Sequence, residues 1–107
     1  MSKGIKHDQG KAPIELISHD ALLEIAKVFD FGAKKYGRWN FRKGMKWSRL
    51  IGAAYRHLGA FNEGEDIDSE SNEQHLAHLA ACIIMLLDYK AKNLGEDDRW
   101  NSDEEAR

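Results

Sequence analysis

Carboxylates and imidazoles lie next to one another in residues 63–78. Positions 63–73 hold six acidic residues and no lysine or arginine. Among them, Glu65 and Asp68 form an E-x-x-D unit. This spacing would place both carboxylates on one side of a helical turn, where they could share a hard cation such as Mg²⁺. The alternative is a solvated acidic loop whose other carboxylates are bystanders.

Two histidines, His75 and His78, follow the acidic run. At positions i and i+3 they share a helix face, a spacing that suits joint metal ligation or contact with phosphate oxygens. The alternative is structural, because a histidine in an apolar helix is often a hydrogen-bonded core residue and one at a helix start can serve the cap. The sequence leaves both interpretations open.

Residues 34–49 carry the opposite charge. The segment contains seven basic residues and no acidic one, with four aromatic residues between them. Lysine and arginine can bind phosphates, an aromatic face can stack on a base, and Asn40 can form the paired hydrogen bonds that identify a base edge. The pattern favours a nucleotide ligand, although a surface loop with its aromatic residues tucked into the core has the same composition.

Three amphipathic segments would position these groups. Apolar residues recur at helical spacing after Ser18, a favourable N-cap, and again along two later segments. No segment alternates apolar and polar residues over a strand length, so the fold is predicted to be all-α. The predicted elements are an irregular arm over residues 1–17, a helix from Ser18 to about Gly37, a connection over 37–46, and helices over about 48–62 and 74–93, the last of them the most buried.

The chain is predicted to form one small helical bundle. Its 107 residues allow one core, and three main helices give only a thin one. A homodimer or higher homo-oligomer is therefore expected to cover the remaining apolar faces. The domain is expected to span residues 1–94, and residues 95–107, with six carboxylates and little periodicity, are predicted to be a disordered acidic tail.

Several classes of protein are excluded by the composition. The longest apolar run is too short for the roughly 20 residues that span a membrane, and the first residues lack the apolar region of a secretory signal, so a cytoplasmic protein is expected. The single cysteine, Cys82, excludes an internal disulfide. The segment HDQGK, residues 7–11, lacks the rest of a Walker loop, and the motifs of zinc fingers, serine hydrolases and zincin proteases are missing.

Four segments in combination resemble one family. HDQGKAP, FGAKKYGRWN, AAYRHLGAFNEGEDIDSES and HLAHLAA are similar to the phage dATP/dGTP diphosphohydrolase family, a relative of the MazG-like nucleotide pyrophosphohydrolases. The resemblance covers about residues 6–89. It implies a MazG-like α-helical homo-oligomer, cytoplasmic in the host cell. Such a protein would use Mg²⁺ (or Mn²⁺) to cleave a purine nucleoside triphosphate, dATP or dGTP, to the monophosphate and pyrophosphate.

The resemblance also implies a set of site residues. The residues expected to act in catalysis are His57, His78 and Glu65. The residues expected to hold the metal ion are Glu65, Asp68 and His75. The residues expected to bind the substrate are Lys11, Lys35 and Arg56 at the phosphates, Asn40 and Trp39 at the base, and Tyr36.

The chain departs from the family pattern at three points, one of which is the bulk that Trp39 adds beside Asn40. The wider MazG-like group carries an E-E-x-x-E helix, and this chain has Arg56 and His57 where that helix is expected. The remaining carboxylate ligands would then come from Glu63, Glu24, Asp8 or a neighbouring subunit. In addition, Asn72 stands where a glycine is expected after the SES turn.

Two other functions stay open. HD-type nucleotide phosphohydrolases are also helical and metal-dependent, and the dipeptides at residues 7–8 and 19–20 nominally match their signature, although both precede or begin the first predicted helix. A non-enzymatic nucleic-acid-binding module would use residues 34–49. The acidic turn and the net charge of −2 disfavour a long polyanion, so a nucleoside triphosphate is the more expected partner.

Overall fold

The fold is all-α, as predicted, in the computed structural model, which describes residues 3–101. None of these residues forms a β-strand, and the helices begin and end within one or two residues of the predicted positions. The elements are α1 (His19–Tyr36), α2 (Trp47–Asn62), α3 (His75–Lys92) and the short 3₁₀ helices η1 (Ile14–Leu16) and η2 (Asn40–Lys43).

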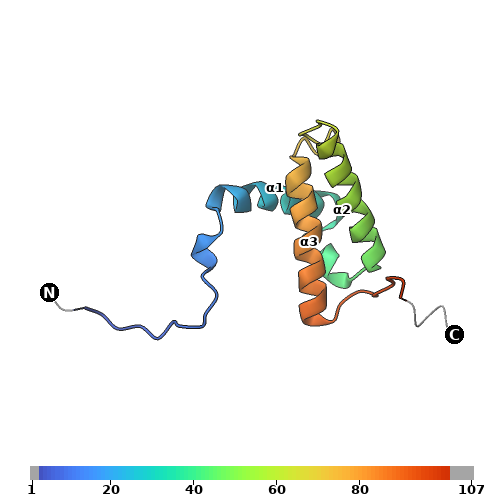
Figure 1. Cartoon of the computed structure of the whole chain (residues 1–107). Helices are drawn as coiled ribbons and strands as arrows, with labels where there is room; N and C mark the ends of the chain where they lie inside the picture. Colours follow the sequence, from blue (N-terminus) through green and yellow to red (C-terminus); the bar gives the residue numbers. More distant parts are fainter. Residues whose placement is uncertain (1–2, 102–107) are drawn as a thin grey trace.

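α3 is the central helix. Figure 1 shows α2 and α3 side by side, with α1 running across them. The core has two small clusters, one between α1 and α3 and one between α2 and α3, and Met85 of α3 packs against both. This arrangement confirms the prediction that α3 is the most buried helix. The buried residues of the two clusters are Val28, Ala77 and Ala81 in the first and Leu50, Cys82 and Tyr89 in the second.

Local sequence signals explain where α1 begins and where α3 ends. The hydroxyl of Ser18 accepts a hydrogen bond from the backbone N–H of Ala21 at 3.2 Å, which confirms Ser18 as the N-cap of α1. α3 ends at Asn93, whose φ of 56° lies in the left-handed region that asparagine tolerates better than most residues. These caps satisfy backbone groups that the helices leave without partners.

The connection between α1 and α2 is fastened to α3. Tyr89 is fully buried, and its hydroxyl donates a hydrogen bond to the carbonyl of Phe41 at 2.5 Å. The Trp47 indole N–H donates to the carbonyl of Leu94 at 3.1 Å, so Trp47 is a structural residue. Gly95 has a φ of 72°, and a Cβ there would lie 2.4 Å from the carbonyl oxygen of Met45, so this close approach needs glycine.

The segment after α3 differs from the prediction. Residues 95–107 were expected to be disordered, but the described part contacts the start of α2. The backbone N–H of Trp47 donates a hydrogen bond to the carbonyl of Glu96 at 2.9 Å. The Asp98 carboxylate accepts hydrogen bonds from the backbone N–H and the hydroxyl of Ser48. An acidic residue is favourable at a helix N-terminus, which is why this acidic stretch docks there. The remaining tail, residues 102–107, lies outside the described residues.

The N-terminal arm and the first half of α1 extend away from the bundle (Figure 1). The radius of gyration is 17.8 Å, against about 13 Å for a compact domain of this length. Large apolar side chains stay exposed on the arm and on α3, Leu87 at 61% among them. The homo-oligomer that would cover them stays a prediction. Within residues 3–101, no helix is both long and apolar enough to cross a membrane.

Candidate functional site

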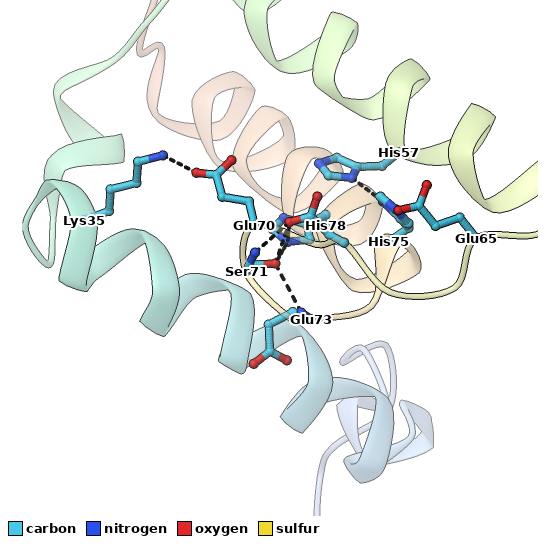
Figure 2. A network of polar contacts seen from close by, with 9 residues as sticks. Lys35, His57, Glu65, Glu70, Ser71, Glu73, His75 and His78 are labelled. Atoms are coloured by element: carbon cyan, nitrogen blue, oxygen red, sulfur yellow. Dashed lines mark hydrogen bonds and ion pairs between the residues drawn. The ribbon is translucent and has the colours of Figure 1, made fainter.

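Three histidines meet where α2 joins α3 through the loop 63–74 (Figure 2). His57 comes from the third turn of α2, and His75 and His78 come from the first turn of α3. The Nδ1 atoms of His57 and His75 are 2.8 Å apart, and the rings of His57 and His78 stack with centroids 4.4 Å apart and planes 8° from parallel. The predicted pair on α3 therefore gains a third imidazole from α2.

The loop 63–74 is not helical, so the helical-turn argument for Glu65 and Asp68 is wrong. A backbone bridge pairs Ile67 with Gln74 and holds this part of the loop extended. The two carboxylates consequently reach different histidines. Glu65 Oε1 lies 3.3 Å from Nε2 of His75, and Asp68 Oδ2 lies 3.7 Å from Nε2 of His78.

Ser71 connects Asp68 to His78. Its backbone N–H and its hydroxyl contact Asp68 Oδ2 at 2.9 and 2.8 Å, and its Oγ lies 2.7 Å from Nε2 of His78. The adjacent Asn72 has a φ of 60°, the left-handed conformation for which glycine was expected. Sequence reasoning missed Ser71, and the D-x-x-S spacing of an Asp side chain capping a turn is the signal that could have found it.

Burial and hydrogen bonding set the charges of the cluster. Burial lowers the pKa of His57, and the neighbouring imidazoles of His78 and His75 lower it further. Burial also lowers the pKa of His78. Burial raises the pKa of Asp68, but the hydrogen bonds from Ser71 outweigh this and leave it below its ordinary value. At neutral pH His57 and His78 are thus uncharged imidazoles, which have lone pairs, beside the ionised carboxylate of Asp68.

A divalent ion fits part of this cluster. Ligand atoms of His57, Asp68 and His75 all lie within 4.8 Å of one another. His75 is 5% exposed, its Nδ1 faces His57, and its Nε2 has no hydrogen-bond partner among the described residues, although the Glu65 carboxylate lies 3.3 Å away. Two imidazole nitrogens and one carboxylate oxygen are a common ligand set that leaves open positions on the metal. Glu65, which was predicted to be a metal ligand, is not one of these three residues and instead contacts Nε2 of His75.

A large cavity, of about 620 Å³, lies between the three helices and the connection 37–46. Three arginines, Arg38, Arg49 and Arg56, are among the residues that line it. His57 and His78 also line it, so the cavity adjoins the histidine cluster. Its other polar residues are Tyr36, Asn40 and Ser48, and its apolar wall includes Phe29, Phe31, Phe41, Met45, Leu50 and Met85.

Five of the predicted site residues therefore line one cavity, and others lie elsewhere. Lys35 does not line it, because its ammonium pairs with Glu70 of the acidic loop (Figure 2). Trp39 lines a different cavity, of about 460 Å³, where the Arg42 guanidinium lies 4.5 Å from its ring. Lys11 belongs to the exposed arm. The five that share the large cavity are Tyr36, Asn40, Arg56, His57 and His78.

The alternative ligands and motifs of the sequence do not join the cluster. Glu24 pairs with Lys27 at 3.2 Å on α1, and Asp8 and Glu63 are exposed. The two dipeptides that match the HD signature, at residues 7–8 and 19–20, are also exposed. Arg38 and Arg49 belonged to the predicted basic segment, but only the folded chain distinguishes them from its other basic residues.

Comparisons with known proteins agree with the sequence resemblance. A family model described as "dATP/dGTP diphosphohydrolase, N-terminal" matches residues 1–99. The dATP/dGTP diphosphohydrolase of Salmonella phage PMBT28 is 40% identical over 101 residues. That match covers 92% of this chain and 34% of the relative, so the chain spans about a third of the relative's length. No solved structure matches the chain. The chain belongs to the dATP/dGTP diphosphohydrolase family, in the region described as its N-terminal part.

Proposed function

We propose that this domain hydrolyses a purine deoxynucleoside triphosphate, dATP or dGTP, to the monophosphate and pyrophosphate. One observation carries the proposal: the cavity that holds the arginines also contains His57 and His78 of the histidine cluster. Binding groups and reactive groups therefore adjoin. The name of the phage relative supports the substrate class. Because the chain spans only a third of that relative, activity of this domain alone is part of the proposal.

The triphosphate binds to the arginines of the cavity wall. Arg56 precedes His57 on α2, and its side chain runs along Gly52, where a Cβ would lie 3.2 Å from its terminal nitrogen. Glycine therefore leaves room for the guanidinium. Together with Arg38 and Arg49 it offers charge-assisted, bidentate hydrogen bonds to phosphate oxygens. These contacts would hold the α-phosphorus near the imidazoles.

The base lies against the apolar part of the cavity. Phe41 and Met45 belong to the connection that Tyr89 fastens to α3, so this wall is held in place. Asn40 is the amide on the wall that can donate to and accept from a base edge. Tyr36, the last residue of α1, adds an aromatic ring to the lining of the cavity. Asn40 is therefore assigned to base recognition.

A proton acceptor is available at His78. The Ser71 hydroxyl has one proton, and donation of that proton to the Asp68 carboxylate leaves its oxygen to accept from Nε2–H of His78. The Nδ1 atom of His78 then keeps its lone pair. An imidazole held in this tautomer can take a proton from a water molecule that attacks the α-phosphorus. Asp68 and Ser71 orient the imidazole in this scheme.

A divalent ion completes the site. His57, Asp68 and His75 would hold it, and it would supply positive charge for phosphate oxygens and increase the acidity of water.

A product analysis tests the proposed function. The purified chain is incubated with each common NTP and dNTP and a divalent ion, and products are separated by chromatography. The expected result is the monophosphate and pyrophosphate, with dATP or dGTP turned over fastest. Release of tripolyphosphate would indicate HD-type chemistry instead. Tight nucleotide binding without any turnover would make this domain a nucleotide-binding module and would contradict the proposal.

A further inference from the structure

We infer that His57, Asp68 and His75 bind a first-row transition-metal ion in preference to Mg²⁺, and that they do so without any nucleotide. The inference deepens the proposed function, on whose site it rests, by naming the class of metal. It starts from the donor atoms: two of the three are imidazole nitrogens, and all lie within 4.8 Å of one another. Mg²⁺ takes oxygen ligands and keeps several waters, whereas imidazole suits iron, nickel, copper and zinc.

The two imidazole nitrogens are already spaced as adjacent ligands. The Nδ1 atoms of His57 and His75 are 2.8 Å apart. Neighbouring nitrogen ligands that each lie about 2.1 Å from one metal ion are about 3 Å apart. The pair would have to open slightly and turn so that both lone pairs point at the ion.

Glu65 selects the tautomer that the metal needs at His75. Its carboxylate oxygen lies 3.3 Å from His75 Nε2, which is buried and has no hydrogen-bond partner. A lone pair at Nε2 would face this negative charge, so the proton belongs at Nε2 and the lone pair at Nδ1. His57 then donates its Nδ1–H to that lone pair. A carboxylate behind a ligating histidine is the usual arrangement in metal sites.

Metal binding therefore exchanges one interaction for another. The neutral His57 moves its proton from Nδ1 to Nε2, and both Nδ1 lone pairs become ligands in place of the hydrogen bond between them. Asp68 is ready as the third ligand, because its backbone N–H is bonded to the carbonyl of Glu73 at 2.8 Å and its carboxylate is held by Ser71.

The ligands also come from three separate parts of the chain. His57 lies on α2, His75 begins α3, and Asp68 lies in the loop between them. The backbone N–H of His75 donates to the carbonyl of Asp66 at 2.9 Å, which fixes the loop against the start of α3. The donor atoms are thus positioned by the fold, and no phosphate is needed to assemble them.

Direct metal binding tests the inference. The chain, without a polyhistidine tag, is stripped with a chelator and titrated with Co²⁺ in the absence of nucleotide, with calorimetry and the visible absorption of Co²⁺ as readouts. The expected result is one equivalent bound, with an absorption spectrum of nitrogen ligation that a large excess of Mg²⁺ leaves unchanged. Loss of the Co²⁺ signal on adding Mg²⁺, or the absence of stoichiometric binding, would overturn the inference.

Variants identify the ligands. His57→Ala and His75→Ala are each expected to weaken Co²⁺ binding at least tenfold, and Glu65→Gln about tenfold through His75. The matched control is His19→Ala, which removes an exposed histidine at the start of α1 and is expected to change nothing. Equal losses in His19→Ala and His57→Ala would contradict the assignment. Circular dichroism of each variant identifies any loss of fold, and the titration of the wild-type chain is decisive in that case.

The two proposals fail separately. Stoichiometric Co²⁺ binding by a chain that hydrolyses no nucleotide would refute the proposed function and keep the metal site. Turnover with Mg²⁺ by a chain that binds no transition metal would refute the metal site and keep the proposed function.

Discussion

The loop 63–74 and the arm 3–17 both carry residues that the family pattern marks, yet they are held very differently. The loop is fastened at both ends, by hydrogen bonds from Glu65 N–H to Ala60 and from His75 N–H to Asp66. The hydrogen bonds described in the arm join only residues two or three apart, such as Lys11 to Asp8, and every residue of the arm is exposed. The matching motifs thus come together in the candidate site only where separate elements hold their side chains close to one another.

Replacing Asp68 should have the largest effect. Asp68→Asn keeps the shape of the side chain but removes the charge that a cation needs, so turnover should fall by roughly a hundredfold or more while the helical content stays unchanged. The specificity constant for dATP and dGTP, measured beside circular dichroism, provides the check. The matched control is Asp66→Asn in the same loop, whose side chain is exposed. If the two variants behave alike, the loop acts only through its total charge.

Arg56→Ala should have the next largest effect, on binding. A lost charged hydrogen bond to phosphate costs about 1.5–3 kcal/mol, so the dissociation constant should rise roughly tenfold to a hundredfold, and equally for all four dNTPs. Arg42→Ala is the control, because Arg42 belongs to the same basic surface but does not line the large cavity. Calorimetry with a non-hydrolysable triphosphate measures both. A weaker effect in Arg56→Ala than in Arg42→Ala would place the phosphates outside the large cavity.

Ser71→Ala should have a smaller effect, on turnover more than on binding. The hydroxyl joins Asp68 to His78 but does not line the cavity, so kcat should fall about tenfold with little change in KM. The free energy of unfolding should fall by about 1 kcal/mol because a buried hydrogen bond is lost. Ser71→Thr keeps a hydroxyl and should restore kcat. Equal losses in both variants would mean that packing, and not the hydroxyl, is what matters.

Lys11→Ala should have the smallest effect in this chain. The arm makes no described contact with the cluster, and exposed substitutions usually change free energies by less than about 0.5 kcal/mol, so kcat/KM should change by no more than about twofold. Steady-state kinetics over a range of protein concentrations is the measurement. A large loss would show that the arm reaches a site, and a loss that grows with concentration would assign that site to a second copy.

Local sequence signals predicted the helices but only part of the site. Ser18, Gly37 and Asn93 mark helix ends through their own backbone preferences, so those boundaries were predictable. Asp68, His75 and His78 were found because they are close in sequence. The docking of Asp98 on α2 depends on packing between distant segments, which spacing does not encode. Ser71 was missed although its D-x-x-S spacing from Asp68 is a local signal. The helical interpretation of Glu65 and Asp68 was wrong because the bridge between Ile67 and Gln74 holds that part of the loop extended.

The most direct test asks whether the cavity and the histidine cluster are one site. Isotope-labelled wild-type chain is first saturated with Zn²⁺, a diamagnetic ion, and is then titrated with α,β-methylene dGTP while NMR follows the Asn40 side-chain amide and the imidazoles of His57 and His78. The three side chains line the same cavity, so their signals should shift together with one dissociation constant, while the signals of the arm stay in place. Shifts confined to the arm, or a cavity that responds without its histidines, would contradict a single nucleotide-hydrolysing site.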